Sequence, residues 1–346
     1  MLINFCSCCV NKMKRSGQLL EKIADYDNLL LAFWSAQRGK QAKAEVVRFR
    51  DDLGRQVSHL RQGLLDGSVN VEQYHYFKIH DPKERLICAA SFRDRVLHHA
   101  IMNICEPCFE SYLIDDTYAC RKGKGSHKAV ARAQHFCRSS RWFISLDIRK
   151  YFDSIDHGIL QNLLERRFKD KRLLQLFEKI IGSYATAPGK GVPIGNLTSQ
   201  YFANHYLGLL DHFIKEQLRI KPYVRYMDNF VLWSEDRRVL KESLRAIGGF
   251  LRERLALTLN DDICLNQTAG GMNFLGYRVF ANIIRLSKRS KKRFSDKFRA
   301  YEACFLNGEW SEQVLQKHMQ PLIAFAQYAH ADNFRRNVIE RFGAVS

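Results

Sequence analysis

The tetrapeptide Tyr226-Met227-Asp228-Asn229 constrains the fold of this chain more than any other feature. Short apolar runs, rich in residues that favour β-strands, lie on both sides of it. Such runs around an Asp-Asn pair predict a hairpin that carries the acidic residue at its tip. The pair also suits an ordinary tight turn, so the hairpin alone leaves both interpretations open.

A second carboxylate follows an apolar run far upstream. Residues 143–146 predict a buried strand, and Asp147 comes directly after it. Two strands that each present a carboxylate can hold two Mg²⁺ ions about 3.5–4 Å apart for phosphoryl or nucleotidyl transfer. Asp147 and Asp228 are therefore the predicted metal ligands.

The chain carries a strong excess of positive charge. Its 346 residues include 55 Lys and Arg against 36 Asp and Glu, a formal net charge of +19. Such an excess indicates a polyanionic partner, although a merely basic protein has the same total. Residues 285–299 are dense in cations, and Phe294 and Phe298 recur there at helical spacing. This pattern predicts a helix that packs one face and offers the other to a phosphate backbone.

The ten cysteines lack the spacing of a disulfide scaffold, and we interpret them as reduced thiols of a cytosolic protein. Cys6, Cys8 and Cys9 form one candidate metal cluster, but no second pair at zinc-like spacing lies near them. Cys105 and Cys108 form another, on a helix expected to break at Pro107, and buried thiols explain them better. No apolar run of 18 residues predicts a membrane span.

The first twelve residues lack the basic region and the length of a secretory signal. Met13 is followed by Lys14 and Arg15, which suits a true start. We therefore expect residues 1–12 to be an extension of the reading frame, and we expect a cytoplasmic protein encoded by a bacterium or phage.

The remaining pattern is mainly helical, with three strand pairs or strands between the helices. The predicted helices cover 18–38, 40–66, 91–105, 126 onward, 158–168, 171–183, 197–218, 236–256, 288–306 and 310–341. A strand pair with a basic tip is expected at 73–88, and a small hairpin at 273–277. A basic glycine loop over 118–127 opens a helix and suits phosphate binding, or is simply flexible.

This order of elements resembles the fingers, palm and thumb of a reverse transcriptase, from about residue 18 to the end. The segment Ile194 to Gln200 stands where most reverse transcriptases carry Gln-Gly-x-x-x-Ser-Pro. Its aliphatic residue before the glycine and its Ser-Gln ending are similar to the reverse transcriptases of diversity-generating retroelements. The segments 92–95, 117–127 and 273–277 also resemble that group.

The resemblance implies an α+β right-hand polymerase with an antiparallel palm sheet and a helical thumb. It implies N-terminal helices and fingers over 13–140, a palm over 141–285 with finger-associated helices at about 158–190, and a thumb over 286–346. It also implies copying of a template-repeat RNA into cDNA that is mutagenised at adenines, from dNTPs. A basic, often pentameric accessory variability protein is the implied partner, without a membrane.

The resemblance also implies roles for individual residues. Asp147, Asp228 and the backbone carbonyl of Ile148 would bind two Mg²⁺ ions, with Mn²⁺ able to substitute. The implied nucleotide-binding residues are Lys83, Arg85, Lys150, Tyr151, Phe152, Ile194, Gly195 and Gln200. The implied primer and template contacts are Tyr226, Met227, Phe274, Leu275, Gly276, Arg121, Lys124, Lys288 and Lys292.

Three of these roles have a specific physical reason. Lys83 and Arg85 would clamp the triphosphate through charge-assisted hydrogen bonds. Phe152 would act as a steric gate against a 2′-hydroxyl, or is an ordinary core aromatic. Ile194 replaces a glutamine that hydrogen-bonds near the base pair, and loss of roughly 1 kcal/mol there would relax discrimination. Alternatively, Ile194 only packs beneath its loop.

The chain departs from the family pattern at Asn229, where a second aspartate is usual. An amide keeps the shape but removes one negative charge, and its oxygen still ligates Mg²⁺ weakly. A tolerated variant, a decayed copy and a deliberate inactivation all explain this residue. The alternatives to the diversity-generating type are a retron or defence-type reverse transcriptase and a silent RNA-binding scaffold.

Overall fold

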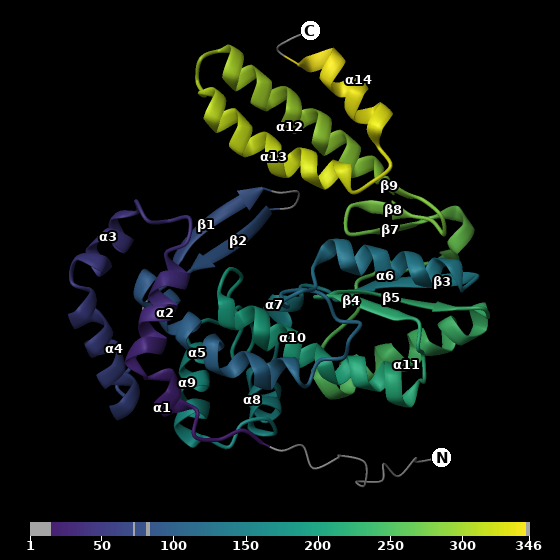
Figure 1. Cartoon of the computed structure of the whole chain (residues 1–346). Coiled ribbons are helices and arrows are strands. Elements are labelled where there is room, and N and C mark those ends of the chain that lie inside the picture. Colours follow the sequence, from purple (N-terminus) through teal and green to yellow (C-terminus); the bar gives the residue numbers. More distant parts are fainter. Residues whose placement is uncertain (1–14, 72, 81–83, 344–346) are drawn as a thin grey trace, which may run out of the picture. The chain divides into compact units, whose positions relative to one another are not determined.

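The computed structural model describes residues 15–71, 73–80 and 84–343, apart from the side chains of His80 and Arg85. Figure 1 shows the order of its helices and strands along the chain. The predicted extension, the cysteine cluster at 6–9 and Lys83 lie outside the described residues. No helix in the described ranges is long and apolar enough to cross a bilayer.

The chain divides into two compact units. The first comprises residues 1–114, 148–213 and 248–259, and the second comprises 115–147, 214–247 and 260–346. Each unit is therefore assembled from segments that are far apart in the sequence. The boundaries expected for fingers, palm and thumb stay predictions.

The first unit is mainly helical, with one strand pair. Its helices are α1 (Leu20–Ile23), α2 (Tyr26–Ala36), α3 (Ala44–Asp51), α4 (Leu53–Asp66), α5 (Phe92–Glu110), α7 (Tyr151–Ser154), α8 (His157–Glu165), α9 (Lys171–Gly182) and α10 (Leu197–His212). Strands β1 (His75–His80) and β2 (Glu84–Ala89) pair antiparallel, as predicted. Helix α11 (Arg237–Leu255) contributes residues to both units.

Local capping decides several helix boundaries in this unit. The helix predicted over 18–38 is two helices, because the Asp25 side chain accepts hydrogen bonds from the amides of Asp27 and Asn28 and starts α2. The predicted break at Pro107 is wrong, since α5 continues to Glu110. Burial of Phe109 and a 2.9 Å hydrogen bond from Arg167 Nε to the Cys108 carbonyl hold this last turn.

The second unit contains a four-stranded antiparallel sheet in the order β4-β5-β3-β6. Its strands are β3 (Trp142–Asp147), β4 (Tyr223–Tyr226), β5 (Asn229–Ser234) and β6 (Cys264–Gln267). Helix α6 (Ser126–Arg138) buries Ala129, Val130 and Phe136 in the same hydrophobic cluster as Phe143, Val231 and Trp233 of the sheet. This packing fixes the sheet whose strands end at the predicted metal ligands.

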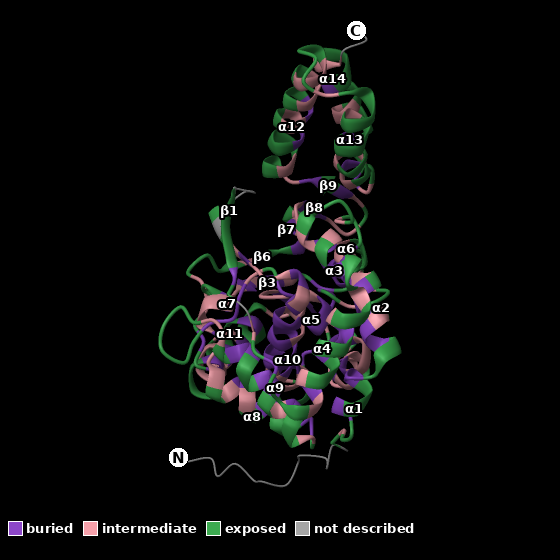
Figure 2. Cartoon of the chain, turned by 90° about the vertical axis from the view of Figure 1, so that its left-hand side faces the viewer, coloured by how far each residue is buried: buried purple, intermediate pink, exposed green. Residues whose placement is uncertain are grey.

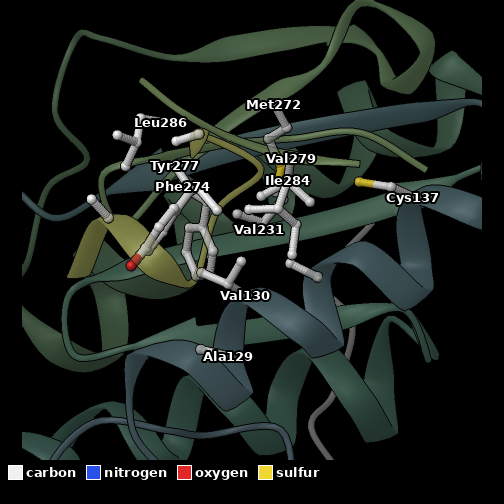
Figure 3. Close-up of a cluster of buried hydrophobic side chains, with 14 of the residues drawn as sticks. Ala129, Val130, Cys137, Val231, Met272, Phe274, Tyr277, Val279, Ile284 and Leu286 are labelled. Atoms are coloured by element: carbon white, nitrogen blue, oxygen red, sulfur yellow. The ribbon is translucent and has the colours of Figure 1, made fainter. Parts of the chain in front are cut away.

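A second, three-stranded sheet packs into the same cluster. Strands β7 (Met272–Phe274), β8 (Tyr277–Val279) and β9 (Ile284–Leu286) bury one face and expose the other. Figure 3 shows the buried side chains of these strands gathered with Val130 of α6 and Val231 of β5. Alternation of apolar and polar residues along each strand gives the sheet this one-sided core.

Three helices follow the second sheet: α12 (Lys288–Leu306), α13 (Glu312–Gln327) and α14 (Asp332–Phe342). The basic helix was predicted over the same residues as α12, with Phe294 and Phe298 on its buried side, and the structure confirms this. Figure 2 shows these three helices mostly exposed or half-buried. Their polar surface is therefore large relative to their core.

Candidate active site

The β4–β5 hairpin places Asp228 at its tip, as the sequence predicts. Tyr226 pairs with Asn229, so the connecting loop has two residues, Met227 and Asp228. Met227 has a φ of 58°, in the left-handed region. A side chain with a Cβ is strained there, so the surrounding structure has to hold the turn.

Arg225 holds this turn from inside the protein. Its side chain is fully buried, and Nη1 donates a 3.0 Å hydrogen bond to the Met227 carbonyl. Its backbone is also fixed, since the Arg225 amide donates to the Asp116 carbonyl and the Tyr118 amide donates to the Arg225 carbonyl, both at 2.9 Å. The left-handed turn is therefore tied to the segment that leads to α6.

Asp147 lies at the end of β3, directly across from Asn229 in the β3–β5 register. Residues paired in this way share one face of the sheet, with Cβ atoms about 4.5–5.5 Å apart. The Asp147 carbonyl accepts a 2.8 Å hydrogen bond from the Asn260 amide, which fixes the end of the strand. The cross-strand neighbour of Asp147 is thus Asn229, and Asp228 lies in the turn directly before Asn229.

The donor set at this strand end fits Mg²⁺. Two carboxylates and an amide oxygen are hard ligands, and Asp147, Asp228 and Asn229 are each half-buried. Within the described residues no group of three or more His, Cys, Asp and Glu side chains gathers as a metal site.

The backbone around Ile148 belongs to the first unit. Ile148 is buried and forms an isolated bridge with Leu259, and the Arg149 amide donates a 2.9 Å hydrogen bond to the Thr258 carbonyl. Ile148 follows Asp147 directly in the chain. Its predicted role as a carbonyl ligand stays a prediction.

The β7–β8 turn brings the backbone of Gly276 close to Ser290 of α12 and Phe325 of α13. Leu275 and Gly276 have φ values of 48° and 87°. The Gly276 carbonyl accepts hydrogen bonds from Ser290 Oγ at 2.6 Å and from the Ser287 amide at 3.0 Å. A Cβ on Gly276 would lie 2.8 Å from Phe325 Cζ, so only glycine fits.

His127 connects the start of α6 with the end of α13. Its ring stacks on Tyr328 at 4.0 Å with an interplanar angle of 5°, and its carbonyl accepts a 2.7 Å bond from the Tyr328 hydroxyl. The Tyr277 hydroxyl donates its proton to the Phe325 carbonyl at 2.9 Å. The 3.2 Å contact of Tyr277 with His127 Nε2 therefore requires that Nε2 carries the proton.

The cations of the glycine loop bind the loop itself. Arg121 Nη1 donates to the Thr117 carbonyl at 2.7 Å, and Lys124 Nζ pairs with the Asp115 carboxylate at 2.5 Å. The hydrogen bond from Lys124 lowers the pKa of Asp115. Ser126 is the first residue of α6, and Gly125, with a φ of 109°, precedes it. The structure thus gives Arg121 and Lys124 a part in shaping this loop.

The predicted nucleotide residues belong to the first unit. Tyr151 is buried and its hydroxyl donates to the Ala203 carbonyl, so it serves the core, whereas Phe152 is half-buried. The Ile194 carbonyl accepts a 2.9 Å bond from the Cys88 amide of β2. A Cβ on Gly195 would lie 3.0 Å from Ile87 Cγ2. The 194–195 loop therefore lies against β2.

The other predicted contacts have the following places. Lys150 is exposed with a φ of 45°, and Gln200 is half-buried on α10. Arg85 pairs through its backbone with Ile79. Lys288 and Lys292 are exposed on α12. Tyr226 is half-buried, Phe274 is buried, and burial raises the pKa of the Tyr226 hydroxyl.

Sequence reasoning did not predict the contacts of two residues, Arg225 beside the Asp228 turn and His127 beside Tyr277 of β8. Arg225 interrupts an apolar strand, and a charged residue in that position is a signal of a buried, hydrogen-bonded role. His127 had no such signal, because its partners Tyr277 and Tyr328 are 150 and 201 residues away. The cysteines with a described environment are free thiols, and burial raises the pKa of Cys137 to about 11.

The sequence profile described as "Reverse transcriptase (RNA-dependent DNA polymerase)" matches residues 78–279, more than half of the chain. The chain therefore belongs to the reverse transcriptase family, and the predicted right-hand polymerase fold class is confirmed. The matched residues include Asp147, Asp228 and the β7–β8 turn.

Two named relatives are 28% and 27% identical to this chain over the residues that match. The group II intron-encoded protein LtrA of Lactococcus lactis subsp. cremoris is 28% identical over 174 residues, which are 48% of this chain and 29% of LtrA. Protein YkfC of Escherichia coli (strain K12) is 27% identical over 241 residues, 57% of this chain and 63% of YkfC. The match thus spans under two thirds of either relative.

A solved structure of telomerase from Candida albicans, in complex with a fragment of telomeric RNA, superposes with a TM-score of 0.47 at 13% identity. It covers 79% of this chain and 57% of that chain. None of these three names refers to a diversity-generating retroelement.

Proposed function

We propose that this protein is an RNA-directed DNA polymerase whose catalytic carboxylates are Asp147 and Asp228. The observation that carries the proposal is the β3–β5 register, which puts Asp147 across from Asn229 beside the turn that presents Asp228. Membership in the reverse transcriptase family supports it. Because the relatives match only in part, activity, substrates and partners are proposals for this chain.

The proposed chemistry divides among the residues for which the sequence predicts a role. Bound Mg²⁺ supplies activation of the primer hydroxyl and neutralises charge on the transferred phosphate. Asp147 and Asp228 would hold the Mg²⁺ ions through their carboxylates, and Asn229 would add an amide oxygen. Lys83 and Arg85 bind the triphosphate of the incoming dNTP, and Phe152 excludes a 2′-hydroxyl.

The turn at Leu275–Gly276 is proposed to hold the primer terminus. Its carbonyl and its glycine are already fixed by Ser287, Ser290 and Phe325, so the turn is rigid before a primer binds. Rigid placement of a reacting strand lowers the entropy cost of the transfer step. Lys288 and Lys292 extend this contact along α12.

We further propose that the enzyme is of the diversity-generating type, copies a template-repeat RNA with errors at adenines, and works with a basic accessory protein. The Ile194 to Gln200 segment supports this subtype. The Ile194 backbone is fixed by the Cys88 amide, so a substitution there changes the side chain chemistry and leaves the loop in place. An apolar side chain offers the base pair no hydrogen bond.

An intron-type reverse transcriptase is the alternative that the likeness to the group II intron-encoded protein LtrA favours. A scaffold that binds RNA without synthesis is the alternative that Asn229 favours. The intron-type enzyme would make cDNA without errors concentrated at adenines, and the scaffold would make no cDNA.

The test is primer extension on an adenine-containing RNA template with Mg²⁺ and dNTPs, in the presence of accessory protein and cognate RNA, followed by sequencing of the product. We expect cDNA with substitutions at template adenines, fewer of them with Ile194→Gln, and no cDNA with Asp228→Asn, which keeps the shape but removes the charge. An adenine error frequency unaffected by Ile194→Gln refutes the subtype. A cDNA product without an excess of substitutions at template adenines supports the intron-type alternative.

The absence of product has two distinct meanings in this experiment. If Asn229→Asp restores synthesis, the fold and site are right and this form is inactive. If neither protein extends a primer while both bind RNA, the scaffold alternative is correct.

A further inference from the structure

The outer face of the three-stranded sheet carries an unusual row of polar side chains. Asn273 of β7 pairs with Arg278 of β8, and Arg278 pairs with Arg285 of β9. All three are exposed, whereas their neighbours along each strand are buried. Two guanidinium groups therefore stand directly opposite each other on one face, an arrangement that destabilises a sheet.

Aromatic rings hold the two arginines in place. Both guanidinium groups lie over the Phe280 ring, Arg278 at 5.4 Å and Arg285 at 5.6 Å from its centroid. The ring itself is held close to Gly271, where a Cβ would lie 2.5 Å from Phe280 Cε1. Cation–π contacts fix the position of such charges and leave them unneutralised.

A cavity of about 400 Å³ lies beside this row. Two cations line it, Arg285 of β9 and Lys291 of α12, together with His330 of the α13–α14 turn, whose Nδ1 lies 3.1 Å from the Ile284 carbonyl. Lys291 is held over the Phe334 ring at 5.5 Å. Among the described residues neither Arg285 nor Lys291 has a carboxylate partner, and Asp332, which also lines the cavity, pairs its carboxylate with Arg335.

We call this group of side chains the outer-face patch. It consists of Asn273, Arg278, Arg285, Lys291 and His330. Its cations are Arg278, Arg285 and Lys291, each held over an aromatic ring, and Arg278 also donates a 2.7 Å hydrogen bond to the Gly270 carbonyl. Arg278 and Arg285 repel each other across the strands, and Arg285 and Lys291 line the cavity. An ordinary solvated surface would explain why these side chains are exposed. It would not explain why Arg278 and Arg285 stand opposite each other without an acidic side chain between them. A bound anion removes the repulsion and explains the arrangement.

We propose that the outer-face patch binds backbone phosphates of a nucleic acid, as a contact separate from the Leu275–Gly276 turn. Guanidinium groups bind phosphate oxygens in a bidentate manner, and Asn273 adds a neutral donor. The choice of a nucleic acid as the source of the phosphates rests on the proposed polymerase function, whereas the anion chemistry rests on the geometry alone.

The test compares two variants with the same loss of three positive charges. The patch variant is Arg278→Gln/Arg285→Gln/Lys291→Gln. The control is Arg48→Gln/Arg61→Gln/Lys317→Gln, three exposed cations elsewhere in the chain. Binding of single-stranded RNA and of an RNA–DNA hybrid is measured without dNTPs over a range of salt concentrations, and inorganic phosphate is tested alone in thermal melts.

The patch variant is expected to lower the slope of log K against log salt by roughly 0.7–0.9 for each phosphate that the protein no longer neutralises, with little change in the control. Its melting temperature without nucleic acid is expected to be equal to or above that of the parent, because the opposed charges are gone. A smaller slope for only one of the two nucleic acids would identify the strand that is bound.

Equal slopes for the parent and the patch variant overturn the proposal, as does an equal loss in the control, which would reflect net charge. Inorganic phosphate that stabilises the parent while RNA binding is unaffected by the patch variant assigns the cavity to free phosphate and also overturns it. Failure of the polymerase proposal would look different, since it is read from primer extension by the parent, whereas the patch is tested by salt slopes measured without dNTPs.

Discussion

The guanidinium of Arg225 donates a 3.0 Å hydrogen bond to the carbonyl of Met227, whose φ of 58° places it in the left-handed region. A buried cation thus holds the strained residue immediately before the Asp228 carboxylate. Strain of this kind costs about 1–3 kcal/mol and persists only where neighbours enforce it. The relationship ties the two-residue loop that carries Asp228, the proposed metal ligand, to the interior of the protein.

The first prediction is that Arg225 and Met227 are energetically coupled. Arg225→Met alone is expected to lower the free energy of unfolding by about 1.5–3 kcal/mol, the worth of a hydrogen bond from a charged group. Met227→Gly removes the left-handed strain, so the same Arg225→Met change should cost less in its background. Urea unfolding of the four proteins measures this coupling, and costs that add within about 0.5 kcal/mol would contradict it.

The second prediction concerns Asn229, which stands directly across from Asp147. Asn229→Asp places two negative charges opposite each other, so without metal the protein should lose roughly 0.2–1 kcal/mol of stability. With Mg²⁺ the added carboxylate should raise metal affinity and turnover. Thermal melts with and without Mg²⁺, together with primer extension rates, measure both effects. Turnover no higher in the Asp form would refute the catalytic half.

The third prediction concerns the glycine of the β7–β8 turn. Gly276→Ala adds a Cβ 2.8 Å from Phe325 Cζ at a φ of 87°, and is expected to lower both stability and primer affinity. Gly308 has a similar φ of 73° with no atom within 4 Å, which makes Gly308→Ala a matched control for backbone strain alone. The control should cost about 1–2 kcal/mol. Equal losses in the two variants would show that close approach is unimportant.

The fourth prediction concerns the contacts of His127 with Tyr277 and Tyr328. His127→Phe keeps an aromatic ring against Tyr328 but removes the bond to Tyr277, whereas His127→Ala removes both. We expect primer dissociation to accelerate from parent to Phe to Ala, while the KM for dNTP is unaffected, because these contacts connect α6 with α13. Single-turnover extension from preformed complexes gives both quantities. A changed dNTP KM with unchanged primer dissociation would exclude this role.

The fifth prediction concerns acid stability and His98, a buried residue of α5. Burial lowers the pKa of His98 to about 3, and neither ring nitrogen has a hydrogen-bond partner among the described residues. His98 thus stays neutral in the folded state, whereas in the unfolded state it takes up a proton below about pH 6.5. The free energy of unfolding therefore falls as the pH decreases from about 6.5 to about 3.

His98→Leu is expected to remove this uptake. The variant should be at least as stable as the parent at pH 7 and should lose less stability between pH 6.5 and 4, by up to about 1.4 kcal/mol per pH unit. Denaturant unfolding at several pH values measures the difference. His59→Leu, at an exposed position on α4, is the control and should leave the pH dependence unchanged.

The sequence predicts the parts of this site that depend on neighbouring residues. Apolar runs that end in Asp147 and surround Asp228 specify strands, and α12 is predicted over the residues it occupies. Register is different, since it depends on strands far apart in the chain. The pairing of Asp147 with Asn229 therefore emerged only from the structure.

Other features that sequence reasoning missed have the same origin. The break expected at Pro107 does not occur because distant residues, Arg167 among them, hold the helix end. The left-handed Met227 and Leu275 have no local signal either, because glycine or asparagine is the usual residue at such positions. In each of these cases long-range packing overrides local preference.

The strand order β4-β5-β3-β6 has a consequence for the synthesis of the protein. Strand β3 leaves the ribosome well before β5 and β6, which flank it in the sheet. At about 5–20 residues per second, Asp147 waits roughly 4–16 s for Asn229 to be made. During that interval an apolar strand has no partner on either edge. A translational pause after residue 147 would prolong this exposure, and the yield of folded protein should therefore depend on translation speed between the two strands.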